Sequence, residues 1–114
     1  MFVQENLHQR WYQLENKLTD KFGKKPDIET ILFLIGLQET GFQTNKISKE
    51  QKQDLMHVAV CILLQPSGYF VFEKFDSDNY PHFKQLKEVP DYLSSEHEDF
   101  FKEHILHYFD KIEF

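Results

Sequence analysis

Two short apolar runs constrain the fold of this chain more than any other feature. They are ILFLIGL at residues 31–37 and VAVCILL at residues 58–64. Wound as a helix, each run is apolar on almost every side, and a helix of that kind is buried by neighbours on more than one face. We therefore expect these two segments to form the central pair of helices. Gly36 would let the neighbouring helix approach closely.

Capping residues predict the ends of both central helices. Asp27 is a candidate N-cap and Gly41 can take the left-handed conformation that ends a helix, which predicts a helix over residues 28–40. Ser48, with a glutamine three residues later, forms a capping box. A Pro-Ser-Gly sequence would stop the second helix, which is therefore predicted over residues 49–65.

A further helix is predicted at each end of the chain. From about residue 4 to residue 22, apolar side chains recur at the spacing of one helical face, and Gly23 follows where that helix would stop. After Pro90, Ser95 and Glu98 form another capping signal that opens the last helix. One face of this last helix would consist of Phe101, Ile105, Tyr108 and Ile112.

The period changes after Gly68. YFVFEKF is rich in aromatic residues without helical spacing, DSDN is typical of a turn, and YPHFKQLKEV could return antiparallel. Residues 69–88 are therefore predicted to form a β-hairpin. The expected fold class is mainly α: four helices with helices two and three central, and one β-hairpin between helices three and four.

The length of 114 residues fits one globular domain, residues 1–114, with its own core. No apolar run approaches the roughly 20 residues that cross a bilayer, and the first ten residues do not resemble a secretory signal. The single cysteine, Cys61, cannot form a disulfide within the chain. We expect a protein of the reducing cytoplasm without a membrane partner.

The charge of the chain is acidic and uneven. Residues 1–53 carry eight Lys and Arg against seven Asp and Glu, whereas residues 54–114 carry five against twelve, for a net charge of −6. The acidic second half would repel phosphate backbones, and no basic stripe compensates for it. Nucleic acid is therefore not an expected partner.

A polar stripe interrupts the third predicted helix. Glu50, Asp54, His57 and Cys61 follow spacings of four, three and four, so they share one side of a helix. Carboxylate, imidazole and thiolate groups all bind metals, and His57 could hold Cys61 as a thiolate for catalysis. A mostly apolar helix also needs one polar edge, with Cys61 packed as a small hydrophobe. The stripe is thus either a metal or ligand site at Asp54, His57 and Cys61, or the polar edge of a core helix.

The predicted hairpin concentrates aromatic residues on two strands. Because a hairpin has two faces, some of these side chains should remain near the surface, unless the core and the last helix cover both faces. Exposed aromatic residues suit a protein partner or self-association. The candidate binding residues are Tyr69, Phe72, Phe75, Tyr80 and Phe83.

Catalytic signatures are absent from the sequence. It contains no Gly-rich phosphate loop, GxSxG elbow or Walker motif. We predict a non-enzymatic protein-interaction module that binds either a protein partner or a second copy of itself. It would use the hairpin aromatic residues and the acidic face of the last helix, with no catalytic residue and no cofactor. A small metal-binding or ligand-binding protein or enzyme, using Asp54, His57 and Cys61, is the alternative.

Three stretches together resemble a family of small uncharacterised soluble bacterial proteins of the Bacteroidetes type. They are FGKKPDIETILFLIGLQETG, KEQKQDLMHVAVCILL and DNYPHF, and the resemblance covers most of the chain. That family has no assigned activity, so the resemblance assigns no catalytic or binding residue here. It implies a bacterial, cytoplasmic, single-domain protein.

Overall fold

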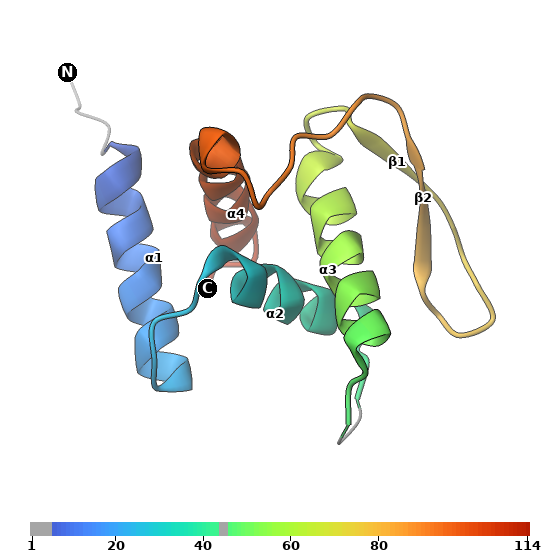
Figure 1. Ribbon diagram of the computed structural model, residues 1–114, viewed down its shortest axis with the longest axis horizontal. Helices are drawn as coiled ribbons and strands as arrows, with labels where there is room; N and C mark the ends of the chain where they lie inside the picture. Colours follow the sequence, from blue (N-terminus) through green and yellow to red (C-terminus); the bar gives the residue numbers. More distant parts are fainter. Residues whose placement is uncertain (1–5, 44–45) are drawn as a thin grey trace. The chain divides into compact units, whose positions relative to one another are not determined.

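A computed structural model describes residues 6–43 and 46–114 of the chain. Within these residues the chain forms four α-helices and one antiparallel hairpin between the third and fourth helices, as predicted (Figure 1). In chain order the elements are α1 (Leu7–Phe22), α2 (Ile28–Thr40), α3 (Lys49–Leu64), β1 (Phe70–Phe75), β2 (Pro81–Gln85), the short 3₁₀ helix η1 (Ser95–His97) and α4 (Glu98–Lys111).

These elements belong to two compact units. One unit is Asp27–Val89, with α2, α3 and the hairpin. The other contains α1 and α4, in the described residues up to Pro26 and in Pro90–Phe114. Each unit is described below by itself, and the single-domain organisation over residues 1–114 stays a prediction.

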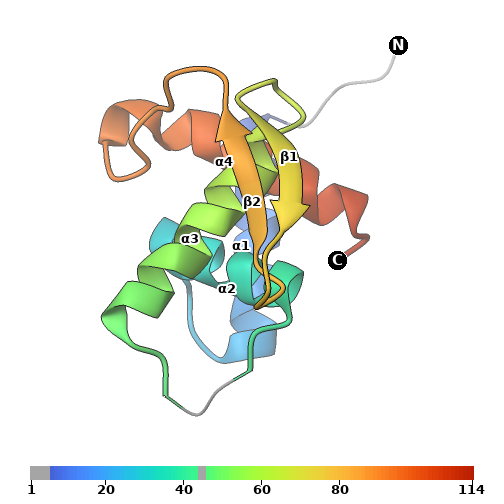
Figure 2. The ribbon, with the colours of Figure 1, turned by 90° about the vertical axis from the view of Figure 1, so that its right-hand side faces the viewer.

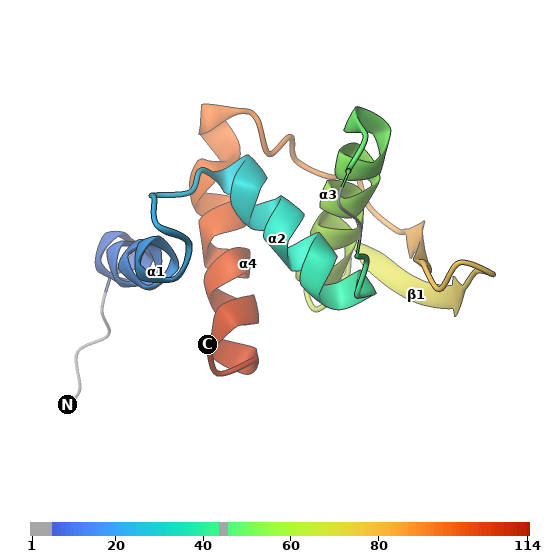
Figure 3. The same ribbon diagram turned by 90° about the horizontal axis from the view of Figure 1, so that it is seen from below.

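Helices α2 and α3 pack closely against each other in the Asp27–Val89 unit (Figure 3). Ile31, Leu32 and Ile35 of α2 are buried, and eight residues of α3 are buried with them. Gly36 allows the close approach that the sequence predicted, because a Cβ atom there would overlap the backbone carbonyl of Leu55. The central pair is therefore in backbone contact at this position.

Local hydrogen bonds end these two helices where the sequence predicted. The Asp27 side chain accepts from the Thr30 N–H at 2.8 Å, and Gly41 ends α2 with a φ of 65°. At the start of α3, Ser48 and Gln51 form both hydrogen bonds of a capping box, at 3.1 and 2.9 Å. The caps satisfy backbone groups that a helix end leaves unpaired.

The hairpin contains a β-bulge that changes which side chains share a face. Phe72 pairs with Phe83, but the next pair is Lys74 with His82, so Glu73 has no partner in the register. A regular strand would place residues 72 and 75 on opposite faces, because side chains alternate. The extra residue instead puts Phe75 on the face of Phe72 and Phe83. Figure 2 shows the hairpin alongside α3.

Helices α1 and α4 pack against each other in the other unit. Trp11, Leu14 and Leu18 form the buried face of α1, while Phe101 and Ile105 are fully buried on α4. At the edge of this pair, an Arg10 guanidinium nitrogen lies 2.8 Å from a Glu103 carboxylate oxygen. The apolar faces predicted for both helices are thus used within this unit.

Some details at the helix ends differ from the sequence-based predictions. The predicted start of the first helix at residue 4 lies outside the described residues, and α1 begins at Leu7 after the Asn6 N-cap. The Ser95 and Glu98 capping box does not form, because Ser94 caps η1 instead and α4 begins at Glu98. Ile112 follows the end of α4 and is exposed, since the buried face of the helix has ended by then.

In the described part of the chain, no helix has both the length and the apolar character that spanning a membrane requires.

Candidate binding groove beside the hairpin

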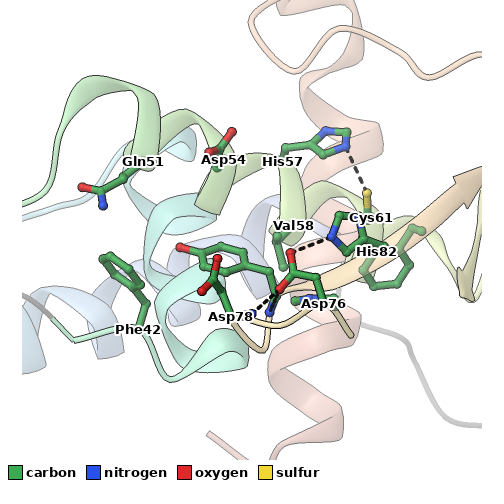
Figure 4. A pocket seen from close by; sticks show the side chains of 12 residues that line it. Phe42, Gln51, Asp54, His57, Val58, Cys61, Asp76, Asp78 and His82 are labelled. Carbon is green, nitrogen blue, oxygen red and sulfur yellow. Dashed lines mark hydrogen bonds and ion pairs between the residues drawn. The ribbon is translucent and has the colours of Figure 1, made fainter. Parts of the chain in front are cut away.

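A partly open groove of about 760 Å³ lies in the Asp27–Val89 unit, between α3 and the hairpin (Figure 4). Its walls come from α3, from the turn between β1 and β2, from the start of β2, and from the segment after α2. The residues that line it are Phe42, Gln51, Asp54, His57, Val58, Cys61, Asp76, Asp78, Tyr80, Pro81, His82 and Phe83.

The helical repeat positions the α3 wall. Residues three and four apart on a helix share one side, so Asp54, His57 and Cys61 all reach the same groove. Asp54 and His57 are exposed at its edge, whereas Cys61 is only 1% exposed. The stripe seen in the sequence is therefore a polar edge that ends on a buried thiol.

The Cys61 thiol is not prepared for nucleophilic chemistry. Its Sγ lies 3.5 Å from His57 Nε2, but burial raises the pKa of Cys61 from 9.0 to about 12. The thiol therefore stays protonated near neutral pH, and its S–H can donate to His57 Nε2 in the tautomer that leaves this nitrogen without a proton. A catalytic cysteine needs its pKa lowered, so this arrangement opposes the predicted thiolate role.

The opposite wall is built by the turn between the strands. An Asp76 side-chain oxygen accepts the N–H groups of Asp78 and Tyr80, at 2.8 and 3.0 Å, and Asn79 takes a positive φ of 65°. The other Asp76 oxygen accepts from His82 Nε2 at 2.8 Å. The His82 hydrogen bond, followed by the one from Tyr80, holds the pKa of Asp76 below its usual range.

The Tyr80 phenol is close enough to three acidic side chains for their charges to affect its pKa. Burial raises the pKa of its phenol, and the charges of Asp54, Asp76 and Asp78 raise it further. The Tyr80 ring also meets the Phe42 ring edge to face, with 6.0 Å between centroids. The groove thus combines aromatic walls with three carboxylates from two different elements.

A second feature lies on the hairpin itself. The Phe72 ring contacts the rings of Phe75 and Phe83, with centroid distances of 5.0 and 5.8 Å. Phe75 is 61% exposed and Phe72 is 40% exposed, while Phe83 is half-buried and also lines the groove. We call these three residues the hairpin aromatic surface.

The predicted binding residues are divided between these two features. Phe72, Phe75 and Phe83 form the hairpin aromatic surface, and Tyr80 lines the groove together with Phe83. Tyr69 belongs to neither feature. It does not line the groove, and its ring contacts the Lys87 ammonium, which lies 4.5 Å from the ring centroid. The structure thus joins two of the five predicted residues to the α3 stripe.

Several residues of the groove were not among the predicted binding residues. They are Phe42, Asp76, Asp78 and His82. Asp76 could have been found from its place at the start of the DSDN turn, where a side-chain carboxylate commonly accepts backbone N–H groups. For Phe42 the sequence contains no comparable signal, because its contact with Tyr80 is long-range.

Among the described residues, no three His, Cys, Asp or Glu side chains are grouped closely enough to hold a metal ion.

Comparison of the chain with protein-family models, with curated proteins and with solved structures finds no match. The resemblance to a Bacteroidetes-type family therefore stays a prediction.

Proposed function

We propose that this protein is a non-enzymatic protein-interaction module that binds a partner through the hairpin aromatic surface. The observation that carries the proposal is the exposure of two phenylalanines whose rings are in contact, Phe75 at 61% and Phe72 at 40%. Large aromatic side chains dominate the binding energy of protein interfaces, and contiguous exposed apolar groups commonly mark such interfaces. The cytoplasm of a bacterium is the location we propose for this binding.

The β-bulge supports a functional role for this surface. Without the extra residue at Glu73, Phe75 would lie on the other face of the hairpin, away from Phe72 and Phe83. Bulges are common where a protein redirects a side chain toward a functional site. Here the bulge gathers three phenylalanines on one face and leaves two of them exposed.

Site-specific photocrosslinking in the native host tests this proposal. We would replace Phe72 or Phe75 with p-benzoylphenylalanine and irradiate the living cells. Tyr12 on α1 is a matched control, because it is an aromatic residue with 60% exposure in the other unit. We expect a discrete protein adduct from the hairpin positions and none from Tyr12.

The effect of a substitution at Phe75 and the identity of the crosslinked protein complete the test. A Phe75→Ser substitution should remove the adduct formed from position 72 without lowering the melting temperature, because an exposed interface residue contributes little to the stability of the monomer. An adduct with a second copy of the chain would identify the partner as the protein itself. No adduct from either hairpin position, or equal adducts from Tyr12, would refute the proposal.

A metal-binding or ligand-binding protein, or an enzyme, remains the second candidate, because Asp54, His57 and Cys61 line one groove. The raised pKa of Cys61 weighs against a thiolate ligand or nucleophile. Metal analysis of protein purified without a histidine tag separates the two candidates. Stoichiometric metal bound to wild type and lost in Cys61→Ala would favour the second.

A further inference from the structure

The groove has an uncompensated negative charge. Three carboxylates line it, Asp54, Asp76 and Asp78, and no Lys or Arg is among the lining residues. Asp76 pairs with His82, whereas Asp54 and Asp78 form no ion pair within the described residues. A cationic group entering the groove would therefore meet two carboxylates that are free to pair with it.

The lysines of the hairpin are not among the residues that line the groove. Lys74 and Lys84 share the hairpin face of His82, opposite the face of Phe72 and Phe83, but neither lysine lines the groove. Lys87 reaches back to the carbonyl of Ser67, at 3.2 Å. The protein does not neutralise the groove with its own lysines, so the complementary charge would have to come from a ligand.

The apolar part of the groove fits a long cationic side chain. Phe42, Tyr80 and Phe83 offer aromatic rings, and Val58 adds an aliphatic surface. The methylene groups of arginine or lysine bury well against such surfaces, and guanidinium groups also stack on aromatic rings. The aromatic rings of the groove therefore match the methylene groups of a basic side chain, and its carboxylates match the charged end.

The groove is continuous with the hairpin aromatic surface. Phe83 lines the groove, and its ring is also 5.8 Å from the ring of Phe72. A segment that packs on Phe72 and Phe75 would therefore pass the mouth of the groove. A second copy of this chain is poorly suited to fill it, because each copy carries a net charge of −6.

We infer that the groove binds an arginine or lysine side chain from the partner protein that packs on the hairpin aromatic surface. This inference rests on the proposed function and specifies the chemistry of the partner, a basic segment. The aromatic surface supplies the apolar contact, while Asp54 and Asp78 select for positive charge.

Two short peptides of equal shape test the inference on the full chain. The probe is acetyl-Gly-Arg-Gly-amide, and its neutral match carries citrulline in place of arginine. Amide chemical shifts would be followed by NMR as each peptide is added to about 10 mM, because a single side chain binds weakly. We expect the arginine peptide to shift the amides of residues 54, 57, 78 and 80 saturably, and the citrulline peptide to leave them unchanged.

Charge-matched variants give the same test from the side of the protein. Asp54→Asn with Asp78→Asn should weaken binding of the arginine peptide about fivefold. Glu73→Gln with Glu88→Gln removes two exposed charges that do not line the groove and should have little effect. If the first variant misfolds, the salt dependence of wild-type binding replaces it, because salt should weaken a charge-selective contact.

Several outcomes would overturn the inference. Equal binding of the citrulline peptide, shifts that map away from the groove, or the same loss in both double variants would each do so. Crosslinking from Phe75 together with an inert groove would refute only the basic-side-chain inference and leave the proposed function in place. Peptide binding by a chain whose hairpin yields no adduct would refute the link to a protein partner.

Discussion

Cys61 shows how burial determines the chemistry of a single residue. Its side chain is 1% exposed on α3, and burial raises the pKa of the thiol to about 12. His57 provides a neighbouring nitrogen at 3.5 Å, but proximity alone does not produce a thiolate. Burial disfavours the charged form, so this cysteine behaves as part of the core.

The raised pKa of Cys61 predicts how stability depends on alkaline pH. The unfolded chain has the ordinary thiol pKa near 9, so it loses the proton first as the pH rises. The stabilisation by the buried neutral thiol is complete below that pH and is lost as the pH rises toward 12. The free energy of unfolding should therefore fall by up to about 1.4 kcal/mol per pH unit from this group.

Urea unfolding at several pH values between about 9 and 11 measures this effect against a Cys61→Ala control. The alanine variant should be less stable throughout, because it leaves a small cavity, but its stability should decline less steeply with pH. Equal slopes for the two proteins would show that the thiol does not have the predicted environment.

At the scale of elements, the contact between α2 and α3 depends on one missing side chain. A Cβ atom at Gly36 would overlap the backbone carbonyl oxygen of Leu55 and lie 2.7 Å from its carbonyl carbon. Backbone atoms cannot rotate away as a flexible side chain can. The whole of α3 would have to shift to accommodate any larger residue at this position.

Gly36→Ala should therefore destabilise the protein, although alanine normally stabilises a helix interior by about 0.5–1 kcal/mol relative to glycine. We expect a loss of about 1–3 kcal/mol from overpacking. Thermal or urea unfolding would measure it, with Gln38→Ala on an exposed position of α2 as the control. A Gly36→Ala variant as stable as wild type would contradict the close approach of the two helices.

In the whole molecule, each of the two compact units contains one residue whose burial can be followed during unfolding. Trp11, the single tryptophan, is buried in the unit that contains α1 and α4, and Cys61, the single cysteine, is buried in the Asp27–Val89 unit. Tryptophan fluorescence and cysteine labelling therefore report separately on the two units.

The single-domain prediction requires these two probes to unfold together. In urea, the fluorescence of Trp11, pulse labelling of Cys61 and the far-ultraviolet circular dichroism should give the same midpoint. The dichroism should be dominated by helix with a minor strand contribution. Two separated midpoints would show instead that the units unfold independently.

The bounds of the helices could be predicted from the sequence because the signals that begin and end a helix are local. Asp27 and Gly41 bracket α2, and the Ser48 capping box starts α3, so the bounds of both helices were predicted to within a residue. The predicted capping box at Ser95 was wrong because Ser94, one residue earlier, offered the same hydroxyl group. Neighbouring residues of the same chemistry compete, and sequence spacing alone does not choose between them.

The position of the candidate site depends on contacts between residues that are far apart in the sequence. Phe42, Asp54 and Asp76 are far apart in the sequence, and they meet because the hairpin folds back along α3. The face of Phe75 depended on one unpaired residue, Glu73, since inserting a single residue reverses the alternation of a strand. Helix periodicity is a property of consecutive residues, whereas a groove and a strand register depend on contacts between distant ones.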